Sequence, residues 1–311
     1  MEETSTLNRT RRESVPSLCP ICECVGGRRV AEHRGLTISK CDECGHGYVW
    51  PVPPAEFIDA IYRNDLYYGG SVDSIGFHDY ASLEAARRRM YTRHLSRIEA
   101  QVTRGHILDV GCATGDFLKV ARSRGWHVYG VDPSAARGLV EAAGIALVGT
   151  TVHDAQVKEG QLDAITFWDV LEHLPNPVAD LARARQLLRP GGVLALTVPD
   201  AANFVARLSG RRWFGYKTAG EHLQFFTQAS LRRALERAQF NVRTCGPTTW
   251  SCTLGFIADR SRIYLGPAGS LVSGLLSTSS LASVVVDVHQ VNQFALGRAM
   301  PVAIAGQASH I

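Results

Sequence analysis

Short apolar runs alternate with amphipathic stretches from His106 onwards, and this alternation constrains the fold more than any other feature of the sequence. The runs predict strands at 106–111, 127–132, 146–150, 164–169, 192–198, 240–246 and 302–307. The intervening stretches predict helices at about 115–124, 134–143, 177–188 and 229–239. Strands that alternate with helices form a parallel sheet covered by helices on both faces, so we expect an α/β fold over residues 105–311.

A glycine-rich turn, Gly111-Cys-Ala-Thr-Gly115, joins the first of these strands to the helix that follows. Glycines let the backbone turn sharply and approach a ligand, and the N-terminus of the helix offers free N–H groups. The spacing does not match the G-x-G-x-x-G fingerprint of dinucleotide sites, and the Gly-Lys-Ser/Thr of a P-loop is absent. Asp132 ends the next strand, where a carboxylate can accept hydrogen bonds from both hydroxyls of a ribose. The alternative is that Asp132 caps the following helix.

Several blocks of the sequence, in this order along the chain, resemble the class I S-adenosylmethionine-dependent methyltransferases. The resemblance is closest to the zinc-module-bearing subgroup found among sugar and natural-product methyltransferases. The matching blocks are 107–115, 130–134, 162–174, 188–199 and the segment that begins His222-Leu-Gln-Phe-Phe-Thr227. The resemblance implies a Rossmann-like sheet of seven strands, with the last strand antiparallel, and S-adenosylmethionine as the cofactor.

The resemblance also implies which residues bind the cofactor. They are Asp109, Gly111, Cys112, Gly115, Asp132, Pro133, Asp154, Ala155, Trp168 and Asp169. In the implied arrangement Asp132 holds the ribose, Asp154 and Ala155 flank the adenine, and Trp168 and Asp169 border the transferred methyl group. The sequence departs from the family pattern at Ala113, which replaces the middle glycine of the loop, and at His153, where relatives usually have an acid.

Two cysteine pairs, Cys19/Cys22 and Cys41/Cys44, have the C-x2-C-x18-C-x2-C spacing of a structural zinc site. We therefore expect a zinc-ribbon module over residues 19–53, preceded by a disordered tail (1–18) and followed by a helical connector (54–104). Four thiolate ligands leave no open position on zinc for catalysis. His33 and His46 are interpreted as surface or packing histidines.

Three side chains are candidates for removing a proton from the acceptor: His222, His173 and Tyr216. Histidine is the commonest general base, and both histidines follow strand ends on the ligand side of the predicted sheet. Each candidate also has a structural alternative. His173 could pair locally with Glu172, His222 could organise its loop, and Tyr216 could cap a core.

These features predict methylation, at oxygen or carbon, of a small or carrier-linked metabolite such as a sugar or natural-product intermediate. The alternatives are a quinone or polyketide O-methyltransferase, an RNA methyltransferase and a non-catalytic binding protein. A net charge of only +4 argues against nucleic acid as a partner. The N-terminal residues show no secretory signal, so we expect a cytoplasmic protein.

Segments 200–228 and 253–299 are expected to cap the acceptor pocket. Residues 263–286 carry no charge, but glycines, serines and Pro267 interrupt them, which argues against a transmembrane span. This stretch is a candidate for a packed cap, a homodimer interface or a contact with a membrane surface.

Overall fold

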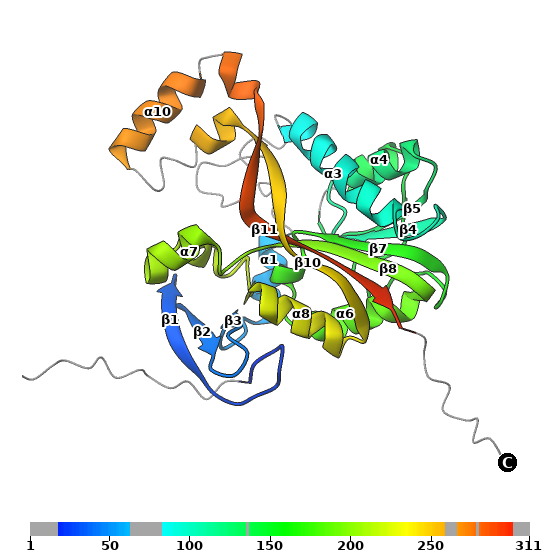
Figure 1. The fold of residues 1–311 in the computed structure, drawn as a ribbon, viewed down its shortest axis with the longest axis horizontal. Coiled ribbons are helices and arrows are strands. Elements are labelled where there is room, and N and C mark those ends of the chain that lie inside the picture. The colour runs from blue at the N-terminus through cyan, green and yellow to red at the C-terminus, as the bar shows by residue number, and fades with distance from the viewer. Residues whose placement is uncertain (1–17, 63–82, 135–136, 259–265, 278–279, 301–311) are drawn as a thin grey trace, which may run out of the picture.

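The computed structural model describes residues 18–62, 83–134, 137–258, 266–277 and 280–300, and contains two β-sheets (Figure 1). The larger sheet has seven strands in the order β10-β11-β8-β7-β4-β5-β6. Its strands are β4 (His106–Val110), β5 (His127–Val131), β6 (Ala146–Leu147), β7 (Leu162–Trp168), β8 (Leu188–Pro199), β10 (Phe240–Thr253) and β11 (Val285–Ala299). Five neighbouring strands run parallel, whereas β11 is antiparallel to both β8 and β10. The predicted seven-stranded sheet with an antiparallel last strand is confirmed.

The seventh strand lies elsewhere in the chain than the sequence pattern predicted. Residues 302–307 fall outside the described residues, as does the predicted tail apart from Leu18. The strand is instead β11, which lies within the segment expected to be a cap. The polar residues Asn292 and Gln293 hide its strand character in the sequence. In the structure their amides donate to the carboxylates of Asp169 (2.9 Å) and Asp200 (3.3 Å).

Helices cover both faces of this sheet, as predicted (Figure 1). The first face is covered by α3 (Glu84–Glu99) and α4 (Asp116–Ser123). Leu95 of α3 and Phe117 of α4 share one apolar core with Ile107. The opposite face is covered by α6 (Pro177–Leu187) and α8 (Gln228–Arg237), where Leu181 and Leu231 pack with Phe167 in a second core.

Further helices are α1 (Ala55–Tyr62), α5 (Arg137–Ala142), α7 (Phe204–Ser209) and α10 (Pro267–Ser277), and residues 254–258 are also helical. Short 3-10 helices add η2 (Leu171–His173), η3 (Gly210–Arg212), η4 (Phe214–Thr218) and η5 (Ser280–Ser283). Among the described residues, no helix is both long enough and apolar enough to cross a membrane.

Arg87, near the start of α3, is only 9% exposed. Its guanidinium donates twice to the carboxylate of Asp116 in the first turn of α4, at 3.0 and 2.8 Å. This ion pair fixes α3 against the helix that follows the glycine loop.

The smaller sheet contains β1 (Gly27–His33), β2 (Leu36–Cys41), β3 (Gly47–Val49) and β9 (Gln224–Phe225), in that order. The first three strands belong to the cysteine module, but β9 comes from the segment that begins at His222. Its pairing with β3 is antiparallel. The cysteine module is therefore joined to the larger domain by a shared sheet.

His46 strengthens this junction from inside the protein. It is fully buried, and its Nε2 donates to Gln224 Oε1 at 2.9 Å, while Nδ1 accepts from the Ser230 hydroxyl at 3.2 Å. The side-chain amide of Gln224 donates in turn to the carbonyl of Leu174 at 3.0 Å, which extends this hydrogen-bond network. Burial lowers the pKa of His46 to about 4, so the ring is neutral at pH 7. The histidine is a packing residue, as expected, and it also carries polar contacts that the sequence did not reveal.

Candidate cofactor and acceptor site

The glycine loop makes a tight turn at the carboxyl end of β4. Gly111 (φ +71°), Ala113 (φ +47°) and Gly115 (φ +74°) all lie in the left-handed region, and Gly115 is the N-cap of α4. A Cβ atom at Gly111 would lie 2.5 Å from a methyl carbon of Val170. Glycine is therefore required at this position for space as well as for backbone conformation.

Asp132 holds the glycine loop from the neighbouring strand. One carboxylate oxygen accepts from the Ala113 N–H at 2.7 Å, and the other accepts from the Ser134 N–H at 2.8 Å and from the Ser134 hydroxyl. The alternative in which Asp132 caps the following helix stays a prediction, because residues 135–136, just before Arg137 of α5, lie outside the described residues. A carboxylate has about four acceptor positions, so these three donors leave room for one more.

Asp109 lies beneath the loop, in β4. It is 3% exposed and accepts from the hydroxyl of Thr166 at 2.6 Å. Burial raises the pKa of Asp109 well above its ordinary value, although the bond from Thr166 opposes this, and the charge of Asp132 raises it further. Cys112, in the glycine loop, is also buried. A Cβ atom at Gly130 would lie only 2.6 Å from the sulfur of Cys112, so the sulfur fills this space.

The segment around Asp154 and Ala155, expected beside the adenine, forms a turn that is held by hydrogen bonds among its own residues. The carboxylate of Asp154 accepts from the backbone N–H groups and hydroxyls of Thr150 and Thr151, at 2.6 to 3.2 Å. Burial opposes ionisation of Asp154, but these bonds outweigh it and lower the pKa to about 2. Ala155 is buried behind the turn. His153 points elsewhere, because its Nε2 lies 3.0 Å from a carboxylate oxygen of Asp180 in α6.

Trp168 and Asp169 end β7 in different surroundings. The Trp168 ring is 8% exposed and stacks on His94 of α3, with centroids 5.0 Å apart and planes at 14°. Asp169 is half-buried with a positive φ of 54°, and its carboxylate accepts from Asn292. Burial raises the pKa of Asp169 to about 6, against the opposing bonds from Thr197 and Asn292.

Two of the predicted acid–base candidates meet just beyond this strand. The rings of His173 and His222 lie edge to face, with centroids 4.7 Å apart. Nδ1 of His173 donates to the carbonyl of Glu221 at 3.0 Å, and its Nε2 lies 4.0 Å from the carboxylate of Glu172. Burial lowers the pKa of both histidines, and His173 lowers that of His222 further.

Tyr216, the third candidate, belongs to an aromatic cluster that packs on the smaller sheet. Its ring meets those of Trp213 and Phe225 edge-on, at 5.1 and 5.3 Å. These contacts match the alternative in which Tyr216 caps a core, and burial raises the pKa of its hydroxyl.

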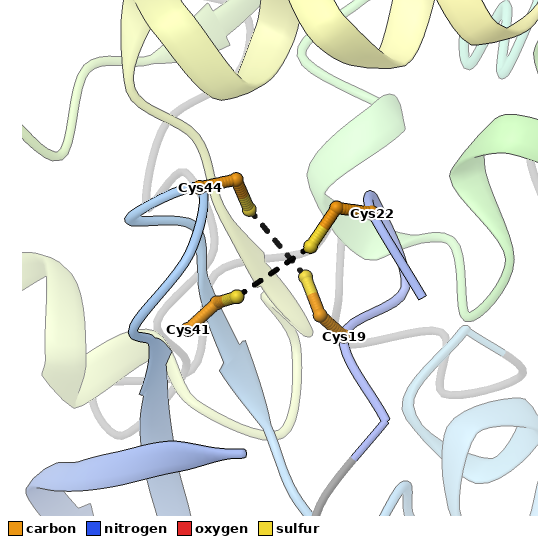
Figure 2. A group of neighbouring side chains, drawn as sticks. All are labelled: Cys19, Cys22, Cys41 and Cys44. Atoms are coloured by element: carbon orange, nitrogen blue, oxygen red, sulfur yellow. Dashed lines mark hydrogen bonds between the residues drawn. The ribbon is translucent and has the colours of Figure 1, made fainter. Parts of the chain in front are cut away.

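The four cysteines predicted to bind zinc converge on one point (Figure 2). The sulfurs of Cys19 and Cys44 are 3.6 Å apart, those of Cys22 and Cys41 are 3.5 Å apart, and all four thiols are free. Zinc–sulfur bonds of about 2.3 Å in a tetrahedron place sulfurs about 3.8 Å apart. The cluster therefore fits a tetrahedral metal ion.

A family model described as a methyltransferase domain matches residues 83–244. The chain belongs to this family and is, by family and fold, a class I S-adenosylmethionine-dependent methyltransferase. The match covers β4 to β8 as well as His173 and His222.

Individual relatives match parts of the chain. A ubiquinone biosynthesis O-methyltransferase from Aromatoleum aromaticum is 34% identical over 191 residues, which is 54% of this chain and 78% of the relative. Another, from Saccharophagus degradans, is 33% identical over 101 residues, or 30% of this chain; the match spans only 43% of that relative's length.

The fold is also similar to that of Haemonchus contortus phosphoethanolamine N-methyltransferase 2, solved with phosphomonomethylethanolamine and S-adenosylhomocysteine. That structure has a TM-score of 0.51 and 15% identity, and the comparison covers 82% of this chain and 63% of the other.

Proposed function

We propose that the protein binds S-adenosylmethionine at the glycine loop and transfers the methyl group to a hydroxyl oxygen of a small or carrier-linked metabolite. The observation that carries the proposal is the convergence of Glu172, His173 and His222 beyond the carboxyl end of β7. Ligands of parallel α/β sheets bind beyond these strand ends. The relatives named ubiquinone biosynthesis O-methyltransferases support oxygen as the acceptor atom. Methylation at carbon, and a sugar or natural-product acceptor, remain predictions from the sequence.

The residues around the glycine loop fit this cofactor. Gly111 allows close approach of a ligand to the backbone, and Asp132 retains one acceptor position for a ribose hydroxyl. The turn at Asp154 and Ala155 would border the adenine. When bound, S-adenosylmethionine supplies an electrophilic methyl group on a sulfonium, so the protein mainly positions the acceptor and manages its proton.

The two histidines are suited to taking that proton. Both are neutral at pH 7, because burial lowers their pKa values. The carbonyl of Glu221 can only accept a hydrogen bond, so the proton of neutral His173 resides on Nδ1 and its lone pair on Nε2. A neutral imidazole at this position can act as the general base for a hydroxyl acceptor.

We also propose that Cys19, Cys22, Cys41 and Cys44 hold one structural zinc ion. Its role would be to stabilise the module that carries β3 and, through β3, the β9 segment beside His222. The test is elemental analysis of the purified protein. One equivalent of zinc, lost when Cys41 and Cys44 are changed to serine, would support the assignment, and a metal-free folded protein would refute it.

The cofactor site is tested by calorimetric titration of S-adenosylhomocysteine. Asp132→Ala is expected to weaken binding at least tenfold, since it removes both the ribose acceptor and the brace on Ala113. Asp132→Asn keeps the shape of the side chain and separates these two effects. Asp42→Ala, which removes an exposed carboxylate, is the control and should bind normally. Absence of binding by the folded wild-type protein would refute the proposal.

The base is tested by methyl transfer to candidate hydroxyl acceptors, beginning with phenolic intermediates of ubiquinone biosynthesis and then nucleotide sugars. His222→Asn should lower kcat by roughly 10²–10⁴-fold, the usual contribution of a general base. Its affinity for S-adenosylhomocysteine should stay within about threefold of wild type. A variant with unchanged kcat would exclude His222 as the base.

A further inference from the structure

Glu172 is a buried carboxylate that the described part of the chain does not satisfy. It is 1% exposed, and neither of its carboxylate oxygens has a hydrogen-bond partner among the described residues. Buried polar groups are nearly always paired, and a buried charge without a partner costs several kcal/mol, roughly. In this geometry a protonated carboxyl would not resolve this, because Nε2 of His173, 4.0 Å away, is too distant to accept from its hydroxyl. The position therefore calls for a group that the described residues do not supply.

The nearest side chains to this carboxylate offer lone pairs rather than protons. Nε2 of His173 points towards Glu172 at 4.0 Å and carries the lone pair, since Nδ1 donates to the carbonyl of Glu221. A ring nitrogen of His222 completes the group, and the three donor atoms all lie within 4.8 Å of one another. An imidazole whose second nitrogen donates to a backbone carbonyl is the usual arrangement of a metal-ligating histidine.

The backbone holds the cluster in place. The carbonyl of Glu172 accepts from the Leu223 N–H at 2.8 Å, which joins η2 to the residue after His222. His222 is further held by its own N–H, which donates to the carbonyl of Thr218 at 2.9 Å. The two segments that supply the donors are thus fixed to each other before any ligand binds.

We propose that Glu172, His173 and His222 bind one divalent cation of the first transition series. Two imidazoles and one carboxylate suit such cations and leave coordination positions open, whereas Mg²⁺ and Ca²⁺ prefer oxygen ligands throughout. Metal–ligand bonds of about 2.1 Å place donor atoms about 3.0–3.4 Å apart. The side chains must therefore approach by about 1 Å when the cation binds, which rotation of the half-buried His222 ring allows.

The cation gives the acceptor site a second function, and this part rests on the proposed methyl transfer. An acceptor hydroxyl that occupies an open position would have its pKa lowered by the cation. With the cation bound, the histidine lone pairs would bind metal and the hydroxyl would lose its proton to water. The general-base role proposed above would then apply to the cation-free protein. The site would favour acceptors with a second oxygen beside the methylated one, because two neighbouring oxygens can occupy two open positions.

The site is tested by titrating Co²⁺ into zinc-loaded protein and following visible absorption. Binding of one equivalent is expected, with d–d bands but without the intense near-ultraviolet charge transfer that thiolate ligands would produce. Glu172→Gln and His222→Asn should each weaken binding at least tenfold, as loss of a ligand requires. His127→Gln is the matched control, because this exposed imidazole lies at the opposite end of the sheet, and its affinity should equal that of wild type.

The outcomes are distinct from those of the cofactor experiment. Protein that binds S-adenosylhomocysteine but takes up Co²⁺ only with thiolate charge transfer refutes the cation site and leaves the proposed function standing. Wild-type affinity in both ligand variants refutes the assignment of these residues. If Glu172→Gln does not fold, His222→Asn decides, since that side chain is only half-buried. Co²⁺ binding without cofactor binding would support the site and refute the methyl-transfer proposal.

Discussion

Replacing His94 should make the protein less sensitive to acid. The imidazole is 1% exposed, and neither of its ring nitrogens has a hydrogen-bond partner among the described residues. Trp168 stacks on the ring at 5.0 Å, and Phe294 stacks on it at 5.2 Å. Burial, with help from the charges of Arg97 and Arg93, lowers the pKa of His94 to about 3.

The size of the effect follows from proton linkage. The folded state binds the His94 proton only near pH 3, whereas an unfolded chain binds it near the usual value of about 6.5. Stability is therefore complete above about pH 6.5 and is lost as the pH falls towards 3. At pH 5, which is about 1.5 pH units below the unfolded pKa, protonation of His94 in the unfolded chain lowers the folding stability by about 2 kcal/mol, since each unit contributes about 1.4 kcal/mol. At pH 7 the same effect lowers the stability by only about 0.2 kcal/mol.

His94→Phe removes this pH-dependent contribution and keeps an aromatic ring in contact with Trp168 and Phe294. Its stability relative to wild type should rise by about 2 kcal/mol between pH 7 and pH 5. The free energy gained by removing unsatisfied polar atoms and the cost of a larger ring are each about 1–3 kcal/mol, and both cancel in this comparison of two pH values. The measurement is urea unfolding of zinc-loaded protein at both pH values.

Other groups titrate over the same range, so only the difference between variant and wild type is informative. His127→Phe, at an exposed position, is the control and should not change the pH dependence of unfolding. A difference between His94→Phe and wild type that is the same at pH 5 and pH 7 would show that His94 is solvated or hydrogen-bonded, and the reasoning would be wrong.

Three further predictions concern the loop and the cysteine module. Gly111→Ala should destabilise the protein by roughly 1–3 kcal/mol, measured by urea unfolding, and should abolish measurable binding of S-adenosylhomocysteine, because the new Cβ would meet Val170 at 2.5 Å in a left-handed backbone. His46→Ala should cost about 3–5 kcal/mol in the same unfolding assay through a cavity and lost hydrogen bonds, whereas the half-buried His33→Ala should cost less than about 1 kcal/mol. Changing Cys41 and Cys44 to serine should speed hydrogen exchange at 222–227, because β9 pairs with β3; unchanged exchange there would show that the module does not support this segment.

Local patterns were sufficient to predict much of the larger sheet. β4 and β5 begin at the predicted residues, His106 and His127, because each is a continuous apolar run bounded by a turn. The glycine loop was also predictable, since its conformations depend on residues adjacent in sequence. The two pairs of cysteines were predicted to converge because the spacing within each pair already suits one metal ion.

Other features depend on partners that are distant in sequence. β11 carries polar residues whose hydrogen-bond partners, such as Asp169 and Asp200, lie on other elements, so periodicity alone could not reveal this strand. The same holds for β9, which is only Gln224–Phe225 and becomes a strand by pairing with the cysteine module.

The sequence by itself determined the fold class, the glycine loop and the convergence of the four cysteines, because each depends on short-range periodicity or spacing. Only the tertiary structure decided that His222 lies beside His173 and that the carboxylate of Glu172 has no hydrogen-bond partner among the described residues. The hydrogen bond from the Leu223 N–H to the Glu172 carbonyl joins η2 to the segment beside the smaller sheet. Burial and unsatisfied hydrogen bonding are properties of the assembled chain, since they exist only once distant segments have excluded water from the same volume.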